Sequence, residues 1–483
     1  MTDQKTLMAV CGHMDQVAGV RQMEFQDGRA AGLRCAMIHN GPLELPLMLD
    51  KCLDPAWIRY KGINLSLLTK PGLQGRNPYD TAGDEAVRSI MGGAMFTCGL
   101  GNVHGNRVVD GVEYPVHGRM RTTPAEKISM DAFWENGEYK ILVSGEMREA
   151  QIFGENLVLR RTIETTYGSR EIVFTDEIEN QGFEDQPLCF LYHCNAGYPF
   201  LVPGLRVVMP SIFCGPRDAD AKAGAAAWNV MEEPVEHAPE QVFQHELAAD
   251  RNGNTFAAFV NDELQIGLCI RFEKSVIPYL TQWKSTAAGD FAMALEPTNC
   301  GFDGRAGKTQ SLKPFEKHEN RIRFQILDGK DDYLWINIRV KGGAYGCMSG
   351  IGRSGEGYFV SYRDPEVKKS DDIYLGIPAY LENFEADERT MTKYVIGTIS
   401  DIDTPLTPSL QGSRGLSAWY SGVTDEMLKK EREEILNATV EDIRALAPIT
   451  KAILETGAVC VVGNEDKIKA DSEIFKEIKP LFA

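Results

Sequence analysis

The feature that most constrains the fold is a succession of short strand-like runs, which extends from the start of the chain to about residue 328. In these runs β-branched and aromatic residues alternate with polar ones, and Gly, Pro, Asn or Asp residues bound each run. The clearest examples cover residues 139–145, 157–167, 171–180 and 321–327. More than about a dozen such runs predict a mainly β domain, built as a large sandwich of antiparallel sheets.

The pattern changes after about residue 329. Apolar residues then recur every three or four positions, which predicts helices over 372–384, 387–399, 425–437 and 440–456. A strand-like run follows at 458–463. We therefore expect two domains, a β-sandwich over 1–329 and a smaller α+β segment over 330–483.

Composition excludes some classes of partner. The 483 residues include 69 acidic and 51 basic ones, a formal charge of -18 that disfavours nucleic acid and anionic membrane surfaces. The polar N-terminus lacks the pattern of a secretory signal, and no apolar run is long enough for a membrane helix. The eleven cysteines include no CxxC pair, so no zinc ribbon is expected. We expect a cytoplasmic protein.

Three residues stand out as candidates for acid–base chemistry. His117 lies in PVHGRM, His193 lies in LYHCNAGYP, and Glu296 lies in LEPTNC after an apolar run. We expect Glu296 to be half buried, with Pro297 ending its strand. Imidazoles and a desolvated carboxylate suit proton transfer to and from a neutral hydroxyl compound. Each of these residues taken singly is also compatible with a purely structural role.

In this order, the three motifs resemble the aldose 1-epimerase-like branch of the galactose mutarotase superfamily. The resemblance covers essentially all of residues 1–328. It implies a β-supersandwich that binds a free sugar and interconverts its α and β anomers. It implies neither a cofactor nor a metal ion.

The resemblance also implies roles for individual residues. Glu296 matches the base that removes the proton of the anomeric hydroxyl, and His193 matches the acid that protonates the ring oxygen. Further residues match substrate-binding positions: His117, Arg119, Asn195, Gln282, Trp283 and Lys284. Where these relatives commonly read Asp-Arg-Gly-Leu-Asp, this chain reads DKCLD at 50–54, so a bidentate guanidinium is replaced by an ammonium.

The second segment resembles the C-terminal part of pitrilysin/insulinase-type metallopeptidases, especially the presequence-protease branch. The matching stretches include YLWINIRVKGGAYG from residue 333 and EEILNATVEDIRALA from residue 433. In that family Arg339 and Tyr345 would match a pair that grips the substrate backbone. The zinc-binding His-x-x-Glu-His run is missing from the sequence, so we expect no zinc and no proteolysis.

The leading hypothesis is a sugar mutarotase that carries an inactive peptidase-derived segment. One alternative is a non-catalytic carbohydrate-binding or sensing module that keeps only the pocket. Another is a protein-interaction role, in which Arg339 and Tyr345 capture an extended peptide by strand addition, or in which the chain forms a homo-oligomer. Isomerisation beyond the anomeric carbon is a further alternative.

Overall fold

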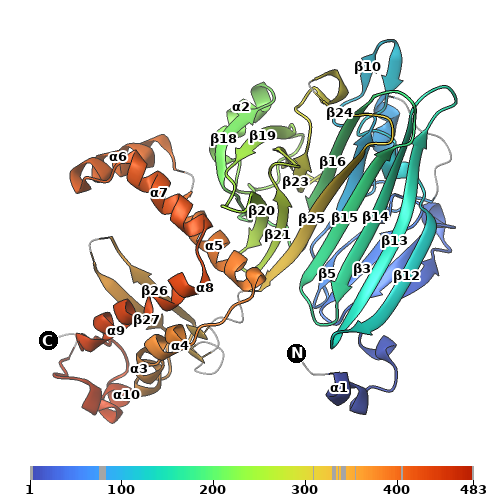
Figure 1. The fold of residues 1–483 in the computed structure, drawn as a ribbon. Helices are drawn as coiled ribbons and strands as arrows, with labels where there is room; N and C mark the ends of the chain where they lie inside the picture. The colour runs from blue at the N-terminus through green and yellow to red at the C-terminus, as the bar shows by residue number, and fades with distance from the viewer. Residues whose placement is uncertain are drawn as a thin grey trace. The chain divides into compact units, whose positions relative to one another are not determined.

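The computed structural model describes residues 4–75, 83–307, 309–328, 333–334, 337–338, 344–353, 355–403 and 406–480. It is mainly β, with helices concentrated after residue 367 (Figure 1). Two compact units can be distinguished. The first comprises residues 1–327 and 396–433, and the second comprises 328–395 and 434–483. The expected domain division at residue 329 stays a prediction.

The largest sheet has eight strands in the order β12-β13-β14-β15-β25-β21-β20-β17. Its strands are β12 (Glu126–Glu135), β13 (Glu138–Ala150), β14 (Asn156–Thr166), β15 (Glu171–Asn180), β25 (Lys317–Asp328), β21 (Ile266–Glu273), β20 (Asn254–Asn261) and β17 (Arg206–Val208). All neighbours are antiparallel where their pairing is given. The four long runs predicted from the sequence correspond to β13, β14, β15 and β25.

A second, seven-stranded sheet follows the order β18-β19-β22-β23-β16-β24, with β9 paired to β16. Its strands are β18 (Ser211–Pro216), β19 (Gln241–Leu247), β22 (Tyr279–Ser285), β23 (Ala292–Thr298), β16 (Gln186–Ala196), β24 (Gln310–Leu312) and β9 (Met95–Leu100). A third sheet contains β1 (Gly19–Glu24), β2 (Arg34–His39), β3 (Leu43–Met48), β4 (Asp54–Pro55), β5 (Arg59–Tyr60) and β6 (Ile63–Asn64). Two short pairs complete this part: β7 (Leu67–Leu68) with β8 (Gly92–Gly93), and β10 (Arg107–Val109) with β11 (Val112–Tyr114).

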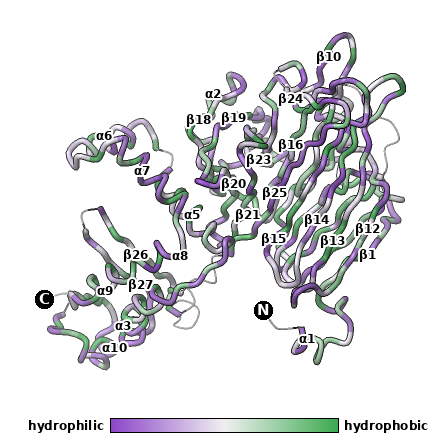
Figure 2. The backbone as a smooth tube through the Cα atoms, viewed as in Figure 1, coloured by the Kyte–Doolittle hydropathy of each residue, from purple (hydrophilic) through white to green (hydrophobic). Residues whose placement is uncertain are grey.

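One hydrophobic core joins these sheets. It includes Ile163 and Phe174 from the eight-stranded sheet and Tyr192 and Leu295 from the seven-stranded one. The long strands alternate hydrophobic and hydrophilic residues along their length (Figure 2), which is the pattern of strands with one buried face. The predicted sandwich is therefore confirmed.

Charged groups also take part in this core. Arg161 is fully buried and forms ion pairs with Asp176 (2.7 Å) and Asp54 (2.9 Å). Asp54 in turn accepts hydrogen bonds from the backbone N–H and the hydroxyl of Thr97. The hydroxyl of Tyr192 donates to Asp176 at 2.8 Å. This buried ion cluster joins β14 and β15 to β9 and β16 through hydrogen bonds.

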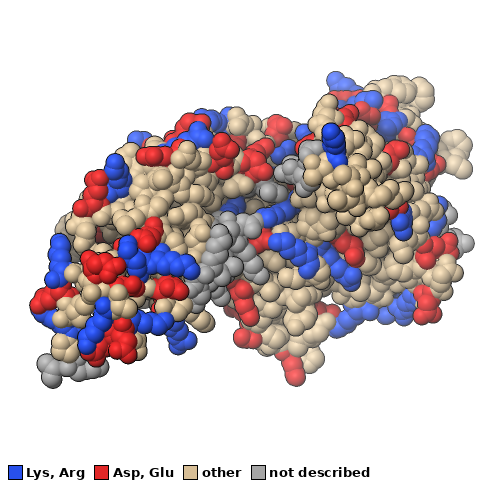
Figure 3. All heavy atoms as spheres, turned by 90° about the horizontal axis from the view of Figure 1, so that it is seen from below, with Lys and Arg blue, Asp and Glu red and all other residues tan. Residues whose placement is uncertain are grey.

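The helices of the sandwich are short, α1 (Gln4–Val10) and α2 (Ala219–Gly224). After residue 328 the elements are β26 (Gly346–Ile351), β27 (Gly357–Tyr362), α3 (Lys368–Leu375), α4 (Ile377–Glu382), α5 (Glu388–Ile402), α6 (Pro408–Ser421), α7 (Asp425–Leu436), α8 (Val440–Arg444), α9 (Ala447–Glu455) and α10 (Glu465–Ala470). No helix of the described part is both long and apolar enough to cross a membrane. Acidic and basic side chains are interspersed over the face seen in Figure 3.

Several sequence predictions for this region need correction. The predicted helix 372–384 is divided into α3 and α4 at Gly376, just before Pro378, and the predicted helix 440–456 is divided into α8 and α9 just before Pro448. Residues 458–463 form no strand, because they pair with no other segment in the described structure. Helix α6 had not been predicted. Its N-terminus is capped by the hydroxyl of Thr407 and followed by Pro408.

Candidate functional site

The two residues expected to transfer protons lie in direct contact. His193 is on β16 and Glu296 is on β23, which are neighbouring strands of the seven-stranded sheet. The Nε2 atom of His193 is 3.1 Å from Oε1 of Glu296. Their side chains are 8% and 3% exposed, so Glu296 is buried more deeply than expected. Residues that are 103 positions apart in the chain are thus brought into contact.

A local irregularity in the sheet lies beside this pair. Between β16 and β23, Leu191 pairs with Thr298 and Cys194 pairs with Leu295, and the positions between them are not paired. Pro297 lies in this gap on the side of β16, and on its other side it pairs with Leu280 of β22. The strand continues through Pro297 to Thr298, so the expectation that this proline ends the strand was wrong.

Asn195 fixes the protonation of the His193 ring. The Asn195 amide nitrogen donates to the carbonyl groups of Gly93 (3.1 Å) and His193 (2.9 Å). Its carbonyl oxygen therefore faces Nδ1 of His193, at 2.7 Å, and accepts a hydrogen bond from that nitrogen. Since Nδ1 carries a proton, the Nε2 atom of a neutral His193 has a lone pair that points toward Glu296.

The pKa directions are consistent with one shared proton. Burial raises the pKa of Glu296 well above its usual value, and the nearby Glu240 raises it further while Arg217 opposes this. Burial lowers the pKa of His193 to about 3, against the opposing effect of its hydrogen bond to Asn195. Both directions favour the uncharged forms of the two residues, in which one proton is available to Oε1 and Nε2.

The pair lines a cavity of about 320 Å³ on the face of the seven-stranded sheet that lies away from the main core. The cavity is lined by Leu67, Thr69, Val87, Ile90, Gly92, Phe96, His104, Gly105, Val116, His117, His193, Asn195, Arg217, Glu240, Val242, Thr281, Trp283 and Glu296. The ring of Phe96 stacks on His193 with centroids 4.3 Å apart. A volume near the lower end of the range for ligand pockets suits a small ligand.

The residues of the HGR motif lie in different places, one in the cavity and the others in the surrounding structure. His117 lines the cavity, and its ring lies edge-on to that of His193 at 5.3 Å. Gly118 has a φ of +71°, and a Cβ there would collide with the carbonyl oxygens of Gly99 and Asn102. Arg119 does not line the cavity, because its guanidinium is directed to Glu149 at 3.6 Å.

Strand β22 shows the same division. Trp283 and Thr281 face the cavity, whereas Gln282 and Lys284 point to the other side of the strand. Gln282 hydrogen-bonds with His245 at 3.0 Å. The ammonium of Lys284 is fully buried and donates to two backbone carbonyls and to Glu232, each at 2.8 Å. Gln282 and Lys284 are thus placed away from the cavity, although the resemblance implied that they bind substrate.

The DKCLD segment also lies away from the cavity. Asp50 accepts hydrogen bonds from the backbone and guanidinium of Arg34, and Asp54 belongs to the buried ion cluster. Burial lowers the pKa of Lys51 to about 8. Lys51, which stands where the relatives commonly have an arginine, therefore does not line this cavity.

Sequence reasoning missed three ionisable cavity residues: His104, Arg217 and Glu240. The guanidinium of Arg217 donates to Glu240 at 2.8 Å and to Asp218 at 2.8 Å. The indole N–H of Trp283 also donates to Glu240 at 2.8 Å, which fixes the aromatic wall. Arg217 and Glu240 lie in segments without a strong motif, and only the pairing of β18, β19 and β22 brings them together. For His104, the only available signal was the neighbouring Gly105.

The C-terminal pair can be placed only in part. Arg339 lies outside the described residues. Tyr345 is 57% exposed, and its ring contacts Tyr362 and the guanidinium of Arg363. The expectation that Arg339 and Tyr345 act together stays a prediction.

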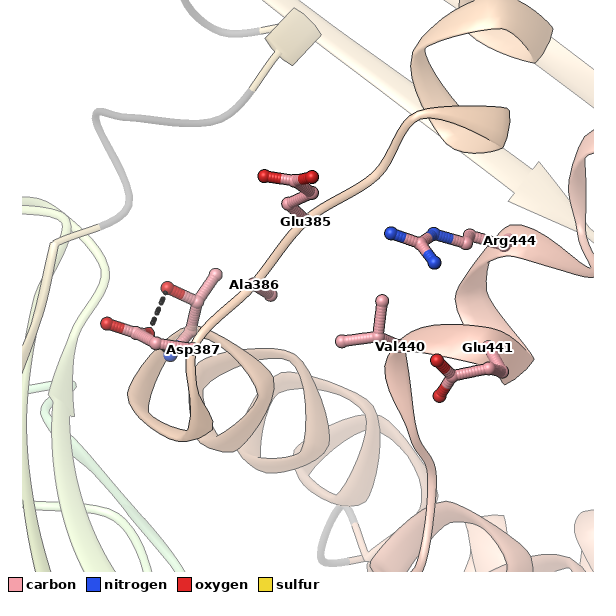
Figure 4. Close-up of a pocket in the computed structure, with 7 residues that line it drawn as sticks. Glu385, Ala386, Asp387, Val440, Glu441 and Arg444 are labelled. Carbon is pink, nitrogen blue, oxygen red and sulfur yellow. Dashed lines mark hydrogen bonds between the residues drawn. The ribbon is translucent and has the colours of Figure 1, made fainter.

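An open groove occurs in the second compact unit (Figure 4). It is lined by Glu385, Ala386, Asp387, Thr390, Val440, Glu441 and Arg444. The guanidinium of Arg444 donates to the carbonyl of Phe384 at 2.8 Å, and Thr390 bonds to Asp387. No histidine or cysteine is among its described lining residues, and across the described part of the chain no cluster of three metal-binding side chains occurs. The sandwich cavity is therefore the stronger candidate site.

A family model described as "Domain of unknown function (DUF4432)" matches residues 30–326, more than half of the chain. The chain belongs to the DUF4432 family. A second model, the PreP C-terminal domain, matches residues 297–465. This match confirms the predicted resemblance of the C-terminal segment to presequence proteases.

A solved structure agrees with the predicted sandwich of this DUF4432 protein. A putative aldose 1-epimerase from Klebsiella pneumoniae has a TM-score of 0.60 and 23% sequence identity, and the match covers 64% of this chain and 83% of that one. At this level of identity the similarity shows the fold alone. The mutarotase-like fold is thereby confirmed.

Curated relatives match part of the chain only. Protein HypA of Clostridium perfringens is 51% identical over 148 residues, which are 31% of this chain and 15% of that protein. Presequence protease 1 of Arabidopsis thaliana is 38% identical over 179 residues, which are 37% of this chain and 16% of that protein. The chain thus spans about one sixth of the length of these relatives.

Proposed function

We propose that this DUF4432 protein is an aldose 1-epimerase, which interconverts the α and β anomers of a free sugar. The observation that carries the proposal is the 3.1 Å contact between His193 and Glu296 inside a cavity of monosaccharide scale. The mutarotase-like fold is consistent with it.

The contact suits the geometry of a cyclic sugar. The anomeric hydroxyl oxygen and the ring oxygen are bonded to the same carbon, so two catalytic groups that touch can reach both oxygens from one side. In the reactive form Glu296 is a carboxylate and His193 carries protons on both nitrogens. The fixed Nδ1 proton ensures that the transferable proton is on Nε2, which faces the cavity.

Ring opening then balances without a cofactor. Glu296 removes the proton of the anomeric hydroxyl, the C1–O1 bond becomes a double bond, and the bond from C1 to the ring oxygen breaks. The ring oxygen takes the Nε2 proton of His193. Rotation about the C1–C2 bond and the reverse steps close the ring on either face. On reclosure His193 takes back the proton of the ring oxygen and Glu296 returns its proton to O1, so one turnover leaves the pair unchanged.

The proposal extends to the C-terminal segment, which we propose to be proteolytically inactive. All eight histidines occur between His13 and His318, and no two of them have the His-x-x-Glu-His spacing. Hydrolysis of an unfolded peptide with added zinc, abolished by a chelator, would contradict this part of the proposal.

The test is Glu296→Gln, which keeps the side-chain shape and removes the base. We expect the rate of anomer exchange to fall by about 10²- to 10⁴-fold, because positioned proton transfer typically contributes that much. Exchange is measured by NMR over a panel of free aldoses, and sugar binding is measured by saturation-transfer difference NMR. Glu246→Gln, on the exposed position of β19, is the matched control. Unchanged exchange in Glu296→Gln would contradict the proposal, and binding without any exchange in the unaltered protein would favour a carbohydrate-binding module.

A further inference from the structure

His104 is a cavity residue to which neither the catalytic pair nor the HGR motif gives a role. It lies in the loop between β9 and β10 and lines the same cavity as His193 and Glu296. Its ring lies edge-on to Phe302, with centroids 6.2 Å apart. Its Nε2 atom is buried and has no hydrogen-bond partner among the described protein groups.

His117 shows the same property on the neighbouring loop. Its Nδ1 atom is also buried and without a protein partner. The two loops are joined by a hydrogen bond from the backbone N–H of His117 to the carbonyl of His104, at 2.8 Å. The buried side chain of Asn102 donates to the carbonyls of Gly105 (3.0 Å) and Pro115 (3.2 Å) and so holds both loops together. The backbone segments that carry the two imidazoles are therefore held next to one another.

Both histidines adopt a backbone conformation that is unfavourable for them. The φ angles are +63° at His104 and +59° at His117, a region that non-glycine residues rarely occupy. Such conformations typically cost about 1–3 kcal/mol each and gather at ligand-binding sites. The two imidazoles are therefore held in place at a conformational cost.

The chemistry of the two free nitrogens points to hydroxyl groups. Burial, together with the charges of Arg107 and Arg217, lowers the pKa of His104 to about 4, and burial lowers that of His117 well below its usual value. A neutral imidazole has one donor and one acceptor nitrogen. A hydroxyl can donate or accept as the tautomer requires, and it removes the cost of a buried unpaired polar atom.

We propose that His104 is a substrate-binding residue that, paired with His117, recognises hydroxyl groups of the sugar other than the anomeric one. This inference rests on the proposed function, in which Glu296 contacts the anomeric hydroxyl and His193 contacts the ring oxygen. The two imidazoles thus set which ring hydroxyls the site accepts. His104 binds and orients the sugar and takes no part in proton transfer.

Two substitutions at one position test this role. His104→Phe keeps an aromatic ring and removes the nitrogens, and we expect KM to rise about 3- to 10-fold while kcat stays within about twofold, as for the loss of one neutral hydrogen bond. His104→Gln places an amide near the position of Nε2, and we expect it to recover most of the affinity. His237→Phe is the matched control, because His237 is exposed and also has a positive φ of +58°.

A series of monodeoxy sugars identifies the hydroxyl. For the sugar that lacks the hydroxyl bound by His104, the unaltered protein and His104→Phe should have the same KM. For the other deoxy sugars the difference between the two proteins should persist. An equal loss for every sugar, or an unchanged KM in His104→Phe, would overturn the proposal.

Binding and turnover separate this inference from the proposed function. Saturation-transfer difference NMR on the same deoxy series reports binding without requiring exchange. If His104→Phe weakens binding selectively and no aldose is turned over, the role of His104 stands and the epimerase proposal fails. If exchange is rapid in the unaltered protein and His104→Phe binds each sugar as tightly as the unaltered protein does, the epimerase proposal stands and the role of His104 fails.

Discussion

Both the sandwich and the region after residue 328 form regular secondary structure. The two regions differ in how many apolar side chains they bury. The sandwich encloses an extended core that draws on all of its large sheets. In the described part of the later region, few apolar side chains are buried: Ile338, Ala344, Ile377, Phe384, Ile396, Ile399 and Ala447. Helix α6 buries none of its residues, and the ribbon β26–β27 has only two strands.

The difference shows that local signals and tertiary partners are separate requirements. Caps, prolines and turn residues suffice to place a helix along the chain. A core needs elements that close over one another, and a two-stranded ribbon or a single amphipathic helix has little with which to do so. The later region matches only the C-terminal part of much longer relatives. A segment that matches only part of a longer protein is expected to expose apolar side chains that the rest of that protein would cover.

The buried ion cluster provides the strongest test of the comparison. Arg161→Met removes the cation between Asp54 and Asp176, and we expect it to lower the free energy of unfolding by about 3–5 kcal/mol, because two buried carboxylates lose their partner. Urea unfolding measures this loss. Lys368→Met is the matched change in the later region, where the pair with Asp372 is about half exposed and screened by solvent, so we expect a far smaller loss. Similar losses in the two variants would contradict the difference between the regions.

Acid should affect the sandwich selectively. Burial lowers the pKa of His245 to about 4, whereas a histidine in an unfolded chain has a pKa of about 6.5. Between these values the unfolded chain binds a proton that the folded one does not, so stability falls as the pH is lowered through this window. His245 contributes a loss of roughly 3 kcal/mol, and His104 and His193 act in the same direction.

The contribution of His245 can be isolated by difference. The stability advantage of the unaltered protein over His245→Gln should shrink as the pH falls from 7 to 4, because buried carboxylates with raised pKa values, such as Asp54, cancel in this comparison. Residues 329–483 contain no histidine, so amide hydrogen exchange in their helices should lack this dependence. If the stability advantage over His245→Gln instead grew as the pH fell, the lowered pKa of His245 in the folded protein would be contradicted.

The smallest effect is expected on α6. Trp419 is 74% exposed, and its replacement in Trp419→Ser should change the free energy of unfolding by less than about 0.5 kcal/mol. Urea unfolding of the full chain measures this. A loss above 1 kcal/mol would mean that this side of α6 is covered in solution. The later region would then bury more apolar surface than the comparison with the sandwich assumes.

The sequence predicted the strands of the sandwich well because each buries one face, and a half-buried strand alternates visibly. The motifs around His193 and Glu296, through the family resemblance that they carry, named the two residues that the structure brings into contact. The sequence did not predict the side on which a motif residue lies. Arg119 is next to Gly118 in the same motif, yet it is directed to Glu149 rather than to the cavity.

Other parts of the site depend on long-range pairing. Glu240 and Arg217 meet only because β18 and β19 are adjacent strands, and nothing local in either segment indicates this contact. The position of His104 likewise depends on the hydrogen bond that its carbonyl accepts from the backbone N–H of His117 on another loop. In the later region, Gly376 with Pro378 and Pro448 shortened helices whose apolar periodicity continued beyond them.

The alternation along β22 has a consequence for how this family can diversify. Positions 281 and 283 can vary to suit a new ligand while the interior is left intact, whereas a change at 282 or 284 alters the packing of the strand first. Natural variants or engineered libraries that seek a different specificity should therefore accumulate tolerated changes at odd-numbered positions of this strand and lose soluble protein at the even-numbered ones.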